Sequence, residues 1–128
     1  MMCDKRKAVL YCRVGPGKRE AAGGLQLQRE FLRKIARQRG LSVAGEVLAC
    51  ETGSTLQRPG WATALRAIQM AQAGVLLVTS GTRISRNTVE LLQALRQLNA
   101  QGVEVQMTAP MQEQAMQLWT HFLCAGGG

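Results

Sequence analysis

The hydrophobic positions of this chain fall into two alternating kinds of segment. Short apolar runs rich in β-branched residues predict strands at 7–14, 41–50, 74–80 and 103–107. Between the strands, apolar residues recur every three or four positions, which predicts helices over 25–39, 61–72 (opened by Pro59) and 88–102, with a last helix starting at 110.

This alternation predicts the class of fold. Strands that alternate with helices are typical of a parallel sheet covered by helices. We therefore expect an α/β fold, a mostly parallel four- to five-stranded sheet with helices on both faces. The 128 residues are expected to form one domain, with a core over 7–108. Its buried positions are predicted at Leu10, Leu32, Ile35, Val47, Leu76, Leu92 and Val105.

Charge narrows the class of partner. Sixteen Lys and Arg against eight acids give a net charge of +8, and twelve of the sixteen are arginine, whose planar fork suits phosphate oxygens. An anionic partner, most simply nucleic acid, is favoured. No apolar run approaches the roughly 18 residues of a membrane span, and no signal-type segment follows the N-terminus. A cytoplasmic protein with four free thiols is expected.

Several reaction classes do not fit the composition. His121 and Asp4 are the single histidine and aspartate, and the glutamates are scattered, so neither a Ser-His-Asp triad nor a metal site is expected. No cofactor is expected either. A P-loop around the turn "GPGK" (15–18) would need glycine at position 12 and serine or threonine at position 19. The chain has Cys12 and Arg19 there. A small-ligand binder that uses "GPGKR" as an anion nest stays open as an alternative.

Arginine remains as the residue type that could carry the chemistry. Arg13 leaves the first predicted strand, Arg58 follows the second, and Arg83 and Arg86 follow the third. The carboxyl ends of parallel strands meet at one edge of the sheet, where α/β folds usually bind ligands. Four guanidinium groups with no acid and no metal suit a phosphodiester and its pentacoordinate transition state.

Four short motifs at these positions resemble the catalytic domain of the serine recombinases, the resolvase and invertase family, over about residues 7 to 124. The family's first strand reads Tyr-x-Arg-Val-Ser, and the chain has "YCRVG" (11–15). The family's Ser-Leu-x-x-Gln is matched by "GLQLQ" (24–28), and its Ser-Gly-x4-Arg loop by "TGSTLQRPG" (52–60). Its Asp-Arg-Leu-Ser-Arg is matched by "TRISR" (82–86).

The resemblance implies a resolvase-like three-layer fold that acts on DNA in site-specific recombination and strand exchange. It also implies a set of site residues. The position of the attacking serine is Gly15, and the residues that contact the DNA phosphate are expected to be Arg13, Gln28, Thr52, Arg58, Arg83 and Arg86.

Two departures from the family pattern put catalysis in doubt. The family's serine attacks the DNA phosphate and becomes attached to a 5′ end, whereas Gly15 has no side chain. The acid before the third motif's arginine is replaced by Thr82. Other conceivable nucleophiles have no motif behind them: Cys12, Ser80, Ser85 and Thr52. We therefore expect a catalytically inactive, DNA-binding recombinase-like domain.

The segment 110–124 resembles the start of the long family helix that dimerises and crosses DNA. Trp119 and Phe122 are its candidate dimer contacts, and only Ala and three glycines follow Cys124. We expect this dimerisation helix to be truncated and the family's separate C-terminal DNA-binding domain to be absent. The chain could form a homodimer, regulate by pairing with an intact serine recombinase, or be a decayed mobile-element fragment. A working enzyme with another nucleophile also stays open.

Overall fold

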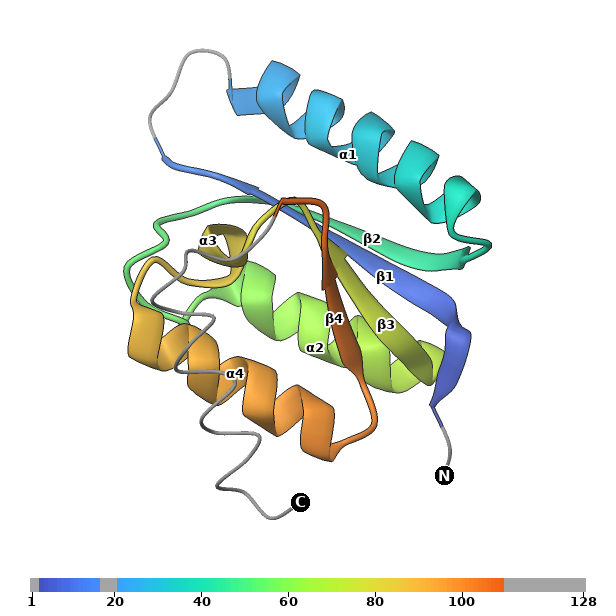
Figure 1. The fold of residues 1–128 in the computed structure, drawn as a ribbon. Coiled ribbons are helices and arrows are strands. Elements are labelled where there is room, and N and C mark those ends of the chain that lie inside the picture. Colours follow the sequence, from blue (N-terminus) through green and yellow to red (C-terminus); the bar gives the residue numbers. More distant parts are fainter. Residues whose placement is uncertain (1–2, 17–20, 110–128) are drawn as a thin grey trace.

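The computed structural model describes residues 3–16 and 21–109 (Figure 1). The predicted last helix, with Trp119 and Phe122, lies outside these residues. The strands are β1 (Asp4–Val14), β2 (Ser42–Cys50), β3 (Ala73–Val78) and β4 (Glu104–Met107). The helices are α1 (Ala21–Gln38), α2 (Pro59–Ala71), α3 (Gly81–Ile84) and α4 (Thr88–Ala100).

The four described strands form one sheet in the order β2-β1-β3-β4, and each neighbouring pair is parallel. The order of the strands changes direction at β1, because β2 is added on one side of β1 and β3 on the other. Such a reversal is the place where open α/β sheets usually bind ligands, outside the carboxyl ends of the strands. The prediction of a mostly parallel sheet is confirmed.

Helices cover both faces of the sheet, as Figure 1 shows. Alternate residues of β1 point to opposite faces. Leu10 packs with Leu32 of α1 on one face, and Tyr11 packs with residues of α2 and α4 on the other. The rings of Tyr11 and Trp61 meet edge to face, with centroids 5.5 Å apart. The predicted three-layer architecture is therefore confirmed.

Most of the predicted core is buried. Ile35 and Val105 are half-buried and pack against the core clusters. The other five predicted positions are buried: Leu10, Leu32, Val47, Leu76 and Leu92.

Cys3, Cys12 and Cys50 are free thiols, and Cys124 lies outside the described residues. None of the described helices is both long and apolar enough to cross a membrane.

Local sequence explains where the helices begin and end. Pro59 starts α2, where its fixed φ suits a first helical residue. Asn87 caps α4, since its side-chain oxygen accepts from the N–H groups of Val89 and Glu90. Gly40 follows α1 with a φ of +70°, which glycine adopts without strain. The four-residue α3 was not predicted, because "GTRI" is too short for a periodic pattern.

Two strand glycines offer a matched test of the packing between β1 and β3. A Cβ on Gly74 would lie 2.6 Å from the carbonyl oxygen of Asp4 and 2.7 Å from the nitrogen of Lys5. Gly74→Ala is expected to lower the free energy of unfolding by about 2–3 kcal/mol, because backbone must move. A Cβ on Gly45 meets only Ala67 and Val9, both at 3.7 Å.

Gly45→Ala is therefore the control, and it should leave stability unchanged or raise it by about 0.5 kcal/mol. Urea denaturation of the two variants measures the difference. Equal midpoints for the two variants would show that the β1–β3 contact at Gly74 does not have this close spacing.

Candidate functional site

Three loops meet at the carboxyl edge of the sheet and bring the predicted arginines together. Arg13 is at the end of β1, Arg58 is in the loop between β2 and α2, and Arg83 belongs to α3, which follows β3. The N–H of Arg86 donates to the carbonyl of Gly53 at 2.8 Å, so the loop after α3 touches the loop after β2. The convergence expected from parallel strands is present.

Arg13 is the residue that ties these loops to one another. Its side chain is 1% exposed. Its Nε donates to the carbonyl of Arg83 at 2.9 Å, and its Nη2 donates to that of Thr82 at 2.7 Å. Its Nη1 donates to the carbonyl of Glu51 at 2.9 Å. A single planar guanidinium thus links the ends of three strands through main-chain oxygens. A lysine could not replace it, because its ammonium group is a compact point charge without the planar fork of donors.

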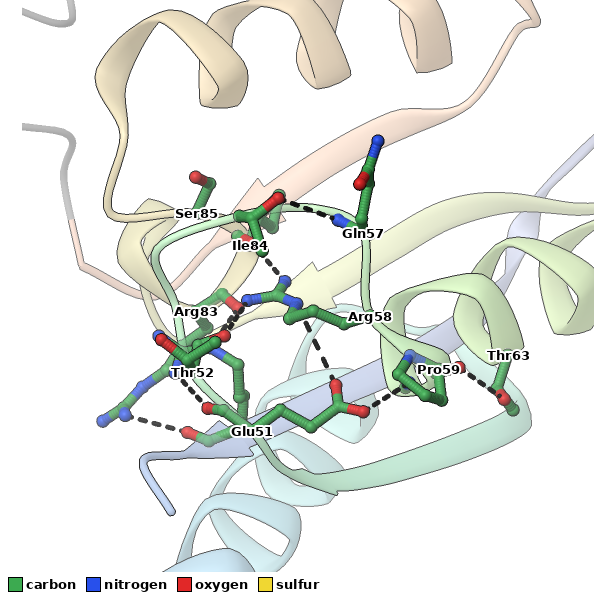
Figure 2. A network of polar contacts seen from close by, with 12 residues as sticks. Glu51, Thr52, Gln57, Arg58, Pro59, Thr63, Arg83, Ile84 and Ser85 are labelled. Atoms are coloured by element: carbon green, nitrogen blue, oxygen red, sulfur yellow. Dashed lines mark hydrogen bonds and ion pairs between the residues drawn. The ribbon is translucent and has the colours of Figure 1, made fainter.

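Arg58 makes a second set of the same kind (Figure 2). It is 5% exposed, its Nη1 donates to the carbonyl of Thr52 at 2.8 Å, and its Nη2 donates to that of Ile84. Its Nε lies 3.9 Å from a carboxylate oxygen of Glu51. Two of the four predicted arginines are therefore buried and hydrogen-bonded to the protein's own backbone.

Arg83 and Arg86 are the more accessible pair. Arg83 is half-buried, and it donates from Nη1 to the carbonyl of Arg13 at 2.9 Å and from Nε to Thr79 Oγ1 at 3.3 Å. Arg86 is exposed.

Gln28 of α1 pairs with the backbone of Arg13, accepting from its N–H at 3.2 Å and donating to its carbonyl at 3.0 Å. Gln28 thus fixes the end of β1 rather than reaching outward.

Positive charge accumulates at this edge. Burial, and then the neighbouring charge of Arg58, lower the pKa of Arg13, with Arg86 and Arg83 adding to the effect. The expectation of a cluster without an acid is wrong, since Glu51 lies beside Arg58. Glu51 directly follows β2 at the same edge, and this placement was the signal that sequence reasoning missed.

Gly53 lets the loop after β2 cross the arginines closely. This glycine is buried. A Cβ there would lie 2.8 Å from Cζ of Arg13 and 3.0 Å from Cγ of Arg86. Because three hydrogen bonds hold the Arg13 guanidinium, it has little freedom to move aside. A residue without a side chain is therefore needed at this position.

Gly15 differs from Gly53, because it has room around it. A Cβ on Gly15 would meet no atom of the described residues within 4 Å, and its φ is not in the left-handed range. Its carbonyl accepts a hydrogen bond from the Cys50 thiol, with the sulfur 3.5 Å from the oxygen. A serine side chain would fit at this position.

The other conceivable nucleophiles are engaged in the fold. Cys12 is fully buried under α1, and burial raises its pKa to about 12, so its thiol is protonated near neutral pH. Ser85 is 1% exposed, donates to Glu90 at 3.1 Å and accepts from the N–H of Asn87 at 3.0 Å.

The two remaining hydroxyl candidates bond to neighbouring hydroxyls. The Ser80 and Thr82 oxygens lie 2.8 Å apart, and those of Thr52 and Ser54 lie 3.0 Å apart. Within residues 3–16 and 21–109 there is also no group of three or more His, Cys, Asp or Glu that could hold a metal ion.

Solved structures show the same fold. The N-terminal catalytic domain of TP901-1 integrase is similar with a TM-score of 0.72 and 18% identity, over 94% of each chain. The C-terminal catalytic domain of ISC1926 TnpA, an IS607-like serine recombinase, gives a TM-score of 0.71 and 20% identity, over 86% of this chain and 74% of that one. A resolvase family site-specific recombinase from Streptococcus pneumoniae gives 0.67 and 22%, over 80% and 72%.

The sequence agrees with these structures. The profile of the family described as Resolvase, N terminal domain, matches residues 8–123, nearly the whole chain. Its matched range includes β1 with Arg13, the loop after β2, and α3 with Arg83. The chain therefore belongs to the resolvase family of serine recombinases, as a domain of the N-terminal, catalytic type.

Proposed function

We propose that this domain binds the phosphodiester backbone of DNA at its arginine edge and does not cleave it. The observation that carries the proposal is the meeting of four arginines from the segments at the carboxyl ends of β1, β2 and β3. They lie beside Gly15, where the family pattern places the attacking serine. Phosphate oxygens are the natural ligands for such a cluster, because an anion offsets the repulsion among the guanidinium groups.

The contacts suggest that the four arginines have different roles in binding. Arg13 and Arg58 are occupied by main-chain carbonyls, so they organise the loops and contribute charge. Arg83 and Arg86 reach the surface and would meet a phosphate first. Thr52 is exposed on the adjoining loop, where its hydroxyl could donate to a phosphate oxygen. Binding of this kind depends strongly on salt.

Lack of cleavage follows from the residue at position 15. In the family reaction the serine oxygen attacks phosphorus, the 3′ oxygen of the DNA leaves, and a phosphoserine bond to the 5′ end remains. Glycine offers no oxygen for this attack. The thiol and hydroxyl groups nearby are buried, protonated or hydrogen-bonded, which supports inactivity over a substitute nucleophile.

Other roles stand beside this proposal. Pairing with an intact serine recombinase, or a homodimer through Trp119 and Phe122, would involve residues outside those described. The decayed-fragment alternative is disfavoured by the hydrogen bonds that Arg13 and Arg58 make to main-chain carbonyls of other loops. The anion-nest alternative falls on a turn whose residues 17–20 lie outside the described part of the chain.

DNA binding can be tested with variants that keep the two buried arginines, Arg13 and Arg58. The double variant Arg83→Ala/Arg86→Ala removes the two accessible arginines. The control, Lys34→Ala/Arg37→Ala, removes two exposed charges near the C-terminal end of α1. Binding of a 20-base-pair duplex in 50 and 200 mM salt is measured by fluorescence anisotropy. The edge variant should lose at least about tenfold in affinity, and the α1 variant clearly less.

Equal losses in the two double variants would show non-specific attraction to a basic surface, and they would contradict a phosphate site at the edge. Arg13 is left intact in this experiment because its removal would leave the carbonyls of Glu51, Thr82 and Arg83 without this donor, which costs stability.

A nicked duplex that traps covalent intermediates tests the lack of cleavage. The natural chain should give no DNA adduct that survives denaturation in detergent. Gly15→Ser and the control Gly15→Ala should both fold with unchanged or slightly raised stability, because a Cβ meets nothing at this position. An adduct formed by the natural chain and mapped by mass spectrometry to Cys12, Ser80, Ser85 or Thr52 would overturn the proposal.

A further inference from the structure

Glu51 is an acid inside a cluster that otherwise consists of arginines. It is the first residue after β2, and its carboxylate is half-buried between Arg58 and the start of α2 (Figure 2). We propose that Glu51 supplies an internal negative charge that partly neutralises the arginine cluster through Arg58 and so limits the affinity of the arginine edge for DNA phosphate. This inference rests on the proposed function and assigns Glu51 as a positioning residue within it.

The two carboxylate oxygens of Glu51 have different surroundings. Oε1 accepts a hydrogen bond from the N–H of Gly60 at 2.8 Å. Oε2 faces Arg58 Nε at 3.9 Å, too far for a hydrogen bond, and both atoms are buried with no hydrogen-bond partner among the described residues. The ion pair is therefore held by charge alone on this side.

The Oε1 contact shows why the carboxylate stays in place. The N-cap residue of α2 is Arg58, whose side chain makes no capping hydrogen bond. Glu51 supplies that bond from the preceding loop to the second residue of the helix, where a negative charge is favourable. A Cβ at Gly60 would lie 2.6 Å from Oε2, so glycine is what allows this close approach.

Charge balance points to the same role. The matching family motif carries an acid at the position of Thr82, so one negative charge is missing from the α3 side of the cluster. Glu90, the next acid along the chain, accepts a hydrogen bond from Ser85 instead. Glu51 is the one acid that forms an ion pair with any of the four arginines within the described ranges. Removing its charge leaves the cluster more positive toward an incoming anion.

The experiment compares two variants that change net charge equally. Glu51→Gln keeps an oxygen acceptor for the Gly60 N–H and removes the charge. Glu104→Gln makes the same charge change at an exposed residue at the start of β4, the opposite edge of the sheet. Both are titrated with the 20-base-pair duplex at several salt concentrations, together with thermal unfolding.

Glu51→Gln is expected to bind DNA roughly three- to tenfold more tightly than Glu104→Gln, from Coulomb's law at an effective dielectric constant of 20 or more. Its plot of log affinity against log salt should steepen by about 0.9, as for one more neutralised phosphate. Glu51→Ala, which also loses the cap, should lower the melting temperature by several degrees. If Glu51→Gln melts near the temperature of the natural chain, the loss in Glu51→Ala is due to the missing capping hydrogen bond and not to the missing charge.

Equal affinities for Glu51→Gln and Glu104→Gln, or weaker binding by Glu51→Gln, would overturn this role while DNA binding at the edge stands. Failure of the natural chain to bind the duplex, or binding that Arg83→Ala/Arg86→Ala does not weaken, would instead remove the proposed function. The two failures are therefore distinguishable in one set of titrations.

Discussion

The buried guanidinium of Arg13 and its three carbonyl partners hold the carboxyl edge of the sheet together. Taking a cation out of water is costly unless its donors are satisfied. Here the donors meet oxygens of Glu51, Thr82 and Arg83, which lie on two loops that follow different strands. The position of each loop is therefore set by the need to satisfy one buried charge. Gln28 completes the arrangement by pairing with the backbone of the same residue.

The same arrangement creates an electrostatic tension. Burial lowers the pKa of Arg13, and the neighbouring charges of Arg58, Arg86 and Arg83 lower it further. Main-chain carbonyls satisfy hydrogen-bond donors but carry only partial charge, so they relieve this repulsion incompletely. A full negative charge is more effective, and Glu51 supplies one from within the fold while DNA would supply one from outside. In the function that we propose, affinity for DNA phosphate depends on how much of the arginine charge Glu51 already balances.

Glycines at this edge serve different purposes. Gly53 is required because the loop passes against the Arg13 guanidinium. Gly15 has free space around its Cβ position and an ordinary φ. The fold therefore does not demand glycine at position 15. The lack of cleavage that we propose would thus be a change in chemistry that leaves the packing around Arg13 and Arg58 intact.

Sequence pattern determined the architecture of this protein. Alternating apolar runs and helical periodicity were sufficient for the parallel three-layer fold, and the rule that parallel strands end at one edge was sufficient to bring Arg13, Arg58 and Arg83 together. The family resemblance was carried by short motifs at those same positions. These features are local or follow from chain direction, so a single sequence contains them.

Tertiary structure alone decided what each arginine does. No pattern distinguishes an arginine that bonds to distant carbonyls from one that faces solvent, because Arg13 reaches oxygens 38 to 70 residues away in the chain. Glu51 was one isolated glutamate in the sequence, and its role depends on a helix start and a guanidinium that only folding places beside it. Burial and long-range hydrogen bonds are properties of the packed chain, and they separate the arginines that build the site from those that are open to a ligand.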